Sequence, residues 1–126
     1  IGRAFDRLAG FVHQSPVVIA GDFNATLLRR PSSGPPRPSP LARRLAHWGF
    51  VSAYHLRHGV EHGDERDATF FRDRRRGART THHTDLVFVD AGCAERITSV
   101  RIEAGPRWLL ASDHGPVVVD LQRSHP

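Results

Sequence analysis

Two short polar segments, each beside an apolar run of strand length, carry the residues best suited to chemistry. Asp22 and Asn24 follow Val-Val-Ile-Ala within the segment Gly-Asp-Phe-Asn-Ala. Asp113 and His114 precede Val-Val-Val within Ser-Asp-His-Gly-Pro. A strand packed into its own core holds the side chains at its ends rigidly. Carboxylates and a carboxamide suit a hard divalent cation such as Mg²⁺, and an imidazole can donate to an oxyanion. These residue types therefore suit metal-assisted hydrolysis of an anionic ester.

The spacing within each segment is compatible with one shared site. Asp22 and Asn24 occupy positions i and i+2, which face the same side of an extended backbone. An Asp-Asn turn that only caps a strand is the alternative. Asn24 is the only asparagine of the chain, so a general abundance of asparagine does not explain it. Asp113 and His114 are adjacent and would face apart on a strand, but the Gly-Pro turn that follows can bring both to one site.

A third segment, Thr-Asp-Leu-Val-Phe-Val, begins at Thr84 and completes an ordered series. The order Gly-Asp-Phe-Asn, then Asp before an apolar strand, then Ser-Asp-His resembles the C-terminal half of the endonuclease/exonuclease/phosphatase superfamily. These are the DNase I-like metal-dependent phosphoesterases. Three motifs in this order are far more specific than any one of them alone.

The resemblance implies a role for each motif residue. Mg²⁺, with Mn²⁺ as a substitute, would be held by Asp22, Asn24 and Asp113. Asp22 would orient or deprotonate the attacking water, and Asn24 would bind the phosphate or its metal. His114 would donate to a phosphate oxygen, and Asp85 would accept a hydrogen bond from the His114 ring and hold its tautomer. The implied catalytic residues are thus Asp22, Asn24, Asp85 and His114.

The middle of the chain resembles a bacterial subgroup of this family. His83 matches the first residue of a His-Ile-Asp-Tyr motif in that subgroup, whereas Thr84 and Leu86 depart from the motif. The segments Ser-Ala-Tyr-His at 52–55 and Thr-Phe-Phe at 69–71 also resemble it. The motifs do not reveal the substrate of this subgroup.

Five histidines are concentrated in the same region: His55, His58, His62, His82 and His83. A transition-metal site is one interpretation of them. Their spacing fits no closed zinc pattern, and Gly59 and Gly63 argue against a single helical face. We therefore expect residues 57–67 to form a solvated polar loop.

The chain carries a formal charge of +5, and all 18 of its Lys and Arg residues are arginine. A positive balance is compatible with a phosphoester substrate, whether nucleic acid, lipid head group or small molecule. The arginine-rich run at 72–79 resembles a phosphate-contacting hairpin, with a solvated turn as the alternative. Hydrophobic residues make up 39% of the 126 residues, which is adequate for a core and argues against global disorder.

Cysteine use and hydropathy indicate a cytoplasmic protein. The single cysteine, Cys93, excludes an internal disulfide and a multi-cysteine zinc site. No run approaches the roughly 18 apolar residues of a membrane span, and no signal pattern opens the chain. The chain begins with Ile1 and not Met, so a signal or anchor could have been lost upstream.

Periodicity predicts two helices and several strands. Apolar positions at helical spacing indicate an amphipathic helix over about residues 1–13. A proline-rich surface loop is expected over about 29–40. With Ser39 as N-cap and Pro40 at the first helical position, a second helix should run to Trp48 and stop at Gly49. Strands are expected at 17–20, 69–71, about 80–89, 97–103 and 117–121.

The predicted fold class is α/β, the C-terminal half of a DNase I-like four-layer α/β sandwich with a mixed or antiparallel sheet and covering helices. Residues 1–126 would form one continuous portion of that domain, with about five strands in one sheet whose other face is uncovered. By resemblance, a missing N-terminal half of the domain would supply a metal-binding glutamate and a second catalytic histidine.

Two functions from different classes follow. The first is a Mg²⁺-dependent phosphoesterase, a phosphodiesterase, nuclease or phosphatase that is inactive as the isolated chain. The second is a non-catalytic phosphate- or nucleic-acid-binding module that keeps these motifs as residual structure.

Overall fold

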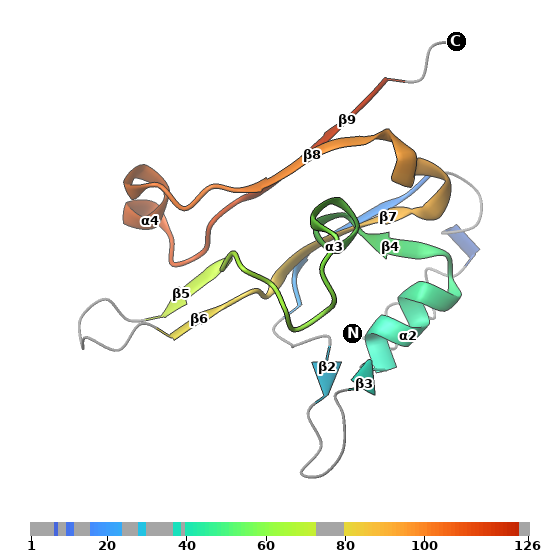
Figure 1. Cartoon of the computed structure of the whole chain (residues 1–126), viewed down its shortest axis with the longest axis horizontal. Coiled ribbons are helices and arrows are strands. Elements are labelled where there is room, and N and C mark those ends of the chain that lie inside the picture. The colour runs from blue at the N-terminus through green and yellow to red at the C-terminus, as the bar shows by residue number, and fades with distance from the viewer. Residues whose placement is uncertain are drawn as a thin grey trace.

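The computed structural model describes residues 7, 10–11, 16–23, 28–29, 37–38, 40–72 and 80–123. The elements in chain order are β1 (Val18–Asp22), β2 (Leu28–Arg29), β3 (Arg37–Pro38), α2 (Pro40–His47), β4 (Phe50–Ser52), α3 (Ala53–His58), β5 (Phe70–Arg72), β6 (Thr80–His82), β7 (Asp85–Asp90), the 3₁₀ helix η1 (Ala91–Arg96), β8 (Ile97–Ile102), α4 (Pro106–Ala111) and β9 (Val117–Leu121). Figure 1 shows their arrangement.

The central sheet has the antiparallel order β1-β7-β4. Its first face is covered by α2, whose Leu45 is only 1% exposed and packs in a cluster with Phe23, Phe50, Leu86 and Phe88. The rings of Phe23 and Phe88 meet edge to face with centroids 5.5 Å apart. The predicted second helix is therefore confirmed, and the apolar stripe of that helix accounts for its position.

The second face of the sheet packs against α3 and the separate β8-β9 hairpin, which lies above the sheet in Figure 1. Val87 of β7, Tyr54 of α3 and Val100 of β8 share this second cluster. Adjacent residues of β7 thus enter two different cores, as the alternation of a strand requires. The molecule has two β layers with helices on and between them, which agrees with the predicted α/β sandwich class.

The expectation of one sheet with an uncovered face is wrong. In the described part of the chain the strands divide among a three-stranded sheet and the pairs β2-β3, β5-β6 and β8-β9. The run Leu-Val-Phe-Val in β7 has apolar residues on both faces, so both faces need a cover. The β8-β9 hairpin supplies the second cover.

Other boundaries also differ from those expected. The strand predicted at 80–89 is two strands, because the chain turns at His83 and Thr84 between β6 and β7. The first two residues of the loop expected at 57–67 belong instead to α3. That helix is followed by its C-cap Gly59, which has a left-handed conformation with φ of 62°. The short helix α4 was not predicted. The predicted strands at 97–103 and 117–121 correspond to β8 and β9.

Three of the sequence-based expectations concern segments that lie largely outside the described residues. Of the helix predicted over 1–13, Arg7, Gly10 and Phe11 are helical, and the rest lies outside the described residues. Most of the proline-rich segment 29–40 and of the arginine-rich run lies outside them too. None of the helices in the described ranges combines the length and apolar content needed to cross a bilayer.

The two leucines Leu45 and Leu110 provide a direct test of this core. We expect Leu45→Ala to lower the free energy of unfolding by about 2–5 kcal/mol, because it removes a fully buried side chain. Leu110 is 83% exposed, so Leu110→Ala should change stability by less than about 0.5 kcal/mol. Urea denaturation of the two variants measures both values. Equal losses would contradict the packing of α2 on the sheet.

Candidate active site

The three motifs of the sequence meet where β7 begins. Nδ1 of His114 lies 2.8 Å from Oδ2 of Asp85, and both side chains are partly buried. The predicted contact between these residues is therefore present. Asp22 is the cross-strand partner of Asp85 in the β1-β7 ladder. Three segments far apart in sequence thus bring Asp22, Asp85, Asp113 and His114 to one end of the sheet.

The carboxylates set the electrostatics of His114. Its hydrogen bond to Asp85 raises the pKa of the imidazole, and the negative charges of Asp113 and Asp22 raise it further. Burial works in the opposite direction but is outweighed. The ring is therefore biased toward the charged form, which donates from both nitrogens. Such a ring can hold Asp85 with Nδ1–H and offer Nε2–H to an anion.

Thr69 aligns the start of β7. Its side chain is fully buried, and its Oγ1 accepts hydrogen bonds from the backbone N–H groups of Thr84 and Asp85, each at 2.9 Å. Its carbonyl accepts from the N–H of Gly115 at 2.7 Å. One residue therefore ties the Asp85 segment to the turn after His114. Only the subgroup resemblance at 69–71 could have drawn attention to it.

The Ser-Asp-His turn is also fixed from β5. The N–H of Phe71 donates to the carbonyl of Asp113 at 2.8 Å, and the Phe70 ring lies 4.8 Å from that of His114. At Gly115 a Cβ atom would approach the carbonyl oxygen of Glu103 to 2.9 Å. Glycine is required there because backbone approaches backbone too closely for a side chain.

A cavity of about 450 Å³ opens beside this group. Asp85, Ser112 and His114 line its polar side, and Val87, Trp108 and Val117 contribute apolar surface. The indole Nε1 of Trp108 is buried and has no hydrogen-bond partner among the described residues. His114 therefore borders the cavity.

The donor types of Asp22 and Asp113 fit a hard cation. Carboxylate oxygens are the ligands that Mg²⁺ prefers, and both residues lie near enough to His114 to act on its charge. Asn24, the third predicted ligand, lies outside the described residues. Its role, like the catalytic and metal-binding roles of the other motif residues, stays a prediction.

A second polar group lies on α3 and the segment that follows it. The ligand atoms of His55, His62 and Glu65 all lie within 4.8 Å of one another. His55 is 9% exposed, and His62 and Glu65 are partly buried, whereas most residues of the expected polar loop at 57–67 are exposed. The sequence gives no regular ligand spacing because the group forms only when residues 59–65 fold back over α3.

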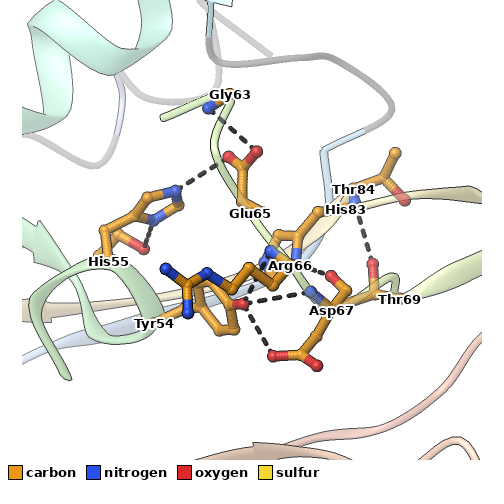
Figure 2. Close-up of polar contacts among 10 residues, drawn as sticks. Tyr54, His55, Gly63, Glu65, Arg66, Asp67, Thr69, His83 and Thr84 are labelled. Carbon is orange, nitrogen blue, oxygen red and sulfur yellow. Dashed lines mark hydrogen bonds and ion pairs between the residues drawn. The ribbon is translucent and has the colours of Figure 1, made fainter. Parts of the chain in front are cut away.

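Figure 2 shows how His55 and Glu65 of this group are held. Nε2 of His55 lies 2.9 Å from Oε1 of Glu65, and the N–H of Gly63 donates to Oε2 of Glu65 at 2.9 Å. Burial lowers the pKa of His55. The pKa of His62 is lowered to about 4, mainly by burial and to a lesser extent by the neighbouring His55. Burial works to raise the pKa of Glu65, but its hydrogen bonds outweigh burial and lower it.

The two groups are joined by the chain between them. Tyr54 donates its hydroxyl to Oδ2 of Asp67 at 2.8 Å, and Nδ1–H of His83 donates to the Asp67 carbonyl at 2.7 Å (Figure 2). Asp67 stands two residues before Thr69, and His83 stands two before Asp85. The same backbone therefore positions both polar groups.

The pKa of His114 offers a test of the pair. Asp85→Asn should lower it toward the ordinary value near 6.5, because the strongest cause of its elevation is removed. A raised pKa in the folded state stabilises the protein below the unfolded-state pKa, and this contribution is lost as pH rises through the folded-state value. The stability difference between wild type and Asp85→Asn should therefore narrow at alkaline pH.

Imidazole NMR titration and denaturation curves at several pH values measure both effects. Asp64→Asn changes an exposed residue that does not act on the charge of His114, so it serves as the control and should leave the titration of His114 unchanged. An unaltered His114 pKa in Asp85→Asn would show that the contact is not made in solution.

Comparison with known proteins gives two findings. A family model described as Endonuclease/Exonuclease/phosphatase family matches residues 3–114. The fold is similar to a solved structure titled "Endonuclease domain of TRAS1, a telomere-specific non-LTR retrotransposon", with a TM-score of 0.63 and 18% sequence identity. That match covers 98% of this chain and 51% of the other, so the chain spans about half the length of that domain. No significant match is found among curated protein sequences.

Proposed function

The chain belongs to the Endonuclease/Exonuclease/phosphatase family, and on that premise we propose that it takes part in metal-assisted hydrolysis of a phosphoester. The observation that carries this proposal is the pair of Asp85 and His114 at 2.8 Å, with Asp22 and Asp113 close to the same ring. An isolated strand-capping motif would not need an oriented, charge-biased imidazole beside a cavity.

We assign the metal to Asp22, Asn24 and Asp113, whose oxygen donors suit Mg²⁺ or Mn²⁺. When bound, the ion supplies a Lewis acid and a water of lowered pKa. Asp22 orients the attacking water and accepts its proton. His114 donates from Nε2–H to a phosphate oxygen, where negative charge develops in the transition state.

Asp85 acts through His114. Its carboxylate accepts the Nδ1 proton, which fixes the ring orientation and favours the charged ring. Thr69 holds the two backbone N–H groups beside that carboxylate and so limits the movement of its strand end. The chemistry thus depends on a hydrogen-bonded chain that runs from Thr69 to the phosphate.

The net charge of the chain is compatible with an anionic substrate. The chain carries +5 overall, which raises the local concentration of anions. Nucleic acid, a lipid head group and a small phosphoester all meet this requirement. Because the chain spans about half of the endonuclease domain to which it is similar, we expect the isolated chain to bind Mg²⁺ weakly and to hydrolyse little. The longest natural form of the polypeptide is therefore the sample for kinetics.

In that form, Asp22→Asn should lower kcat at least ~10²-fold, the usual scale for removing a general base. Asn24→Ala and His114→Ala should each cost ~10²–10³-fold, as for the loss of an oxyanion donor. The measurement is Mg²⁺-dependent cleavage of DNA and of a chromogenic phosphodiester. Asp120→Asn, an exposed change on β9, is the matched control and should keep the wild-type rate.

Two results would count against the proposal. A near-normal rate for folded Asp22→Asn would exclude its role in activating water. The absence of metal-dependent hydrolysis from every form of the protein would favour the phosphate- or nucleic-acid-binding module.

A double-mutant cycle tests whether Asp85 acts through His114. Asp85→Ala and His114→Ala should be strongly non-additive in kcat/KM, because an orienting carboxylate has nothing to orient once the ring is removed. Four rate constants and four melting curves decide the matter. Rate effects that multiply in normally folded variants would mean that Asp85 contacts something else in the transition state.

A further inference from the structure

We propose that His55, His62 and Glu65 bind one divalent transition-metal ion, with Zn²⁺ as the best chemical match. Two imidazoles and one carboxylate are a zinc donor set, whereas Mg²⁺ prefers oxygen ligands. In the described part of the chain, this is the group whose ligand atoms gather within 4.8 Å. The site is distinct in residues and in donor chemistry from the one assigned to Mg²⁺.

The distances are close to those of a coordinated ion. Tetrahedral zinc with bonds of about 2.0–2.1 Å holds its ligand atoms about 3.4 Å apart. Nε2 of His55 and Oε1 of Glu65 are already 2.9 Å apart, and the rings of His55 and His62 have centroids 3.7 Å apart. The ligand atoms, which now lie within 4.8 Å of one another, would draw together to about the tetrahedral spacing when an ion binds.

Groups behind the ligands hold them in place. Ser52 Oγ lies 2.7 Å from Nδ1 of His55, and the N–H of Gly63 donates to the oxygen of Glu65 that faces away from the ring. Ligand histidines in zinc sites commonly donate their second ring N–H to such a partner. With the single ring proton on Nδ1, donated to Ser52, the Nε2 lone pair of His55 is available to the metal. No proton has to leave the site, because only the tautomer changes.

Buried nitrogens without partners support an occupant. Nδ1 of His62 is buried and has no hydrogen-bond partner among the described residues. Nε2 of His83 is also buried and lacks a hydrogen-bond partner among the described residues, and the His83 ring lies 6.1 Å from that of His55. Buried polar atoms are normally satisfied. A cation bound by His62 would satisfy the first of these atoms.

The ion would fasten the segment after α3 to the helix. His55 belongs to α3, whereas His62 and Glu65 belong to the connection that leads to Asp67 and Thr69. That connection has no helix or strand between residues 59 and 69. Fixing it at Glu65 would hold Asp67 and Thr69, and through Thr69 the start of β7.

Metal-free protein titrated with Co²⁺ and with Zn²⁺ alone tests the proposal. We expect one equivalent of Co²⁺ to give the intense visible absorption of a tetrahedral site, and Zn²⁺ to displace it with a rise in Tm. His62→Gln and Glu65→Gln should each weaken Zn²⁺ binding, measured by calorimetry, at least ~10²-fold. Ser52→Ala should weaken it ~10–100-fold, the scale for a hydrogen-bonded group behind a ligand.

Two controls separate this site from other histidines and from the phosphoester site. His47→Gln changes an exposed histidine at the end of α2, and Asp22→Asn changes the proposed Mg²⁺ site; neither should alter the cobalt spectrum or the Zn²⁺ affinity. A wild-type protein without the tetrahedral spectrum would overturn the proposal even if every variant fails to fold. Stoichiometric Zn²⁺ binding that survives His62→Gln and Glu65→Gln would overturn it as well.

Discussion

Burial of β7 on both faces is the constraint on which the rest of the structure depends. This strand pairs with β1 on one side and β4 on the other, and its residues alternate between two apolar clusters. The helix α2 covers one face, and α3 with the β8-β9 hairpin covers the other. Because the strand is immobilised in this way, its first residue, Asp85, is a fixed point. The imidazole of His114 can then be oriented by a contact that costs little further ordering.

Thr69 connects the rigid start of β7 to the turn that carries His114 and Gly115. Its buried hydroxyl accepts hydrogen bonds from the backbone N–H groups of Thr84 and Asp85 and so satisfies two donors at the start of β7. The carbonyl of the same residue accepts from Gly115, where the backbone passes too close to Glu103 for any side chain. The geometry of the candidate site is therefore set largely by hydrogen bonds to the main chain, and the side chains of Asp85 and His114 are attached to that frame.

The sequence was informative where a chemical motif or a regular hydrophobic period marks an element. The three ordered motifs led to the family, to the fold class and to the contact between Asp85 and His114, and the alternation of residues 97–103 predicted β8. It was less informative where tertiary contact decides. The turn at His83 and Thr84 is stabilised by the Thr69 hydroxyl and the Asp67 carbonyl, neither of which has a local signal. The six residues of α3 are too few to show a helical period, and the group of His55, His62 and Glu65 exists only because that helix and the following segment fold together. Asn24 and the first helix lie beyond what the described residues can test.

The register of β1 against β7 has a consequence for how this protein can change. Asp22 and Asp85 stand opposite each other in the ladder, and like charges in such a pair oppose the pairing of their strands. The third carboxylate, Asp113, adds to the negative charge around His114. These carboxylates gather at the end of the sheet where the chemistry is assigned, and a positive charge there, whether a proton on His114 or a cation, interacts favourably with all three. Selection for a more robust fold alone would remove these carboxylates, so their persistence in a lineage would record selection for what they do and not for how well the chain folds.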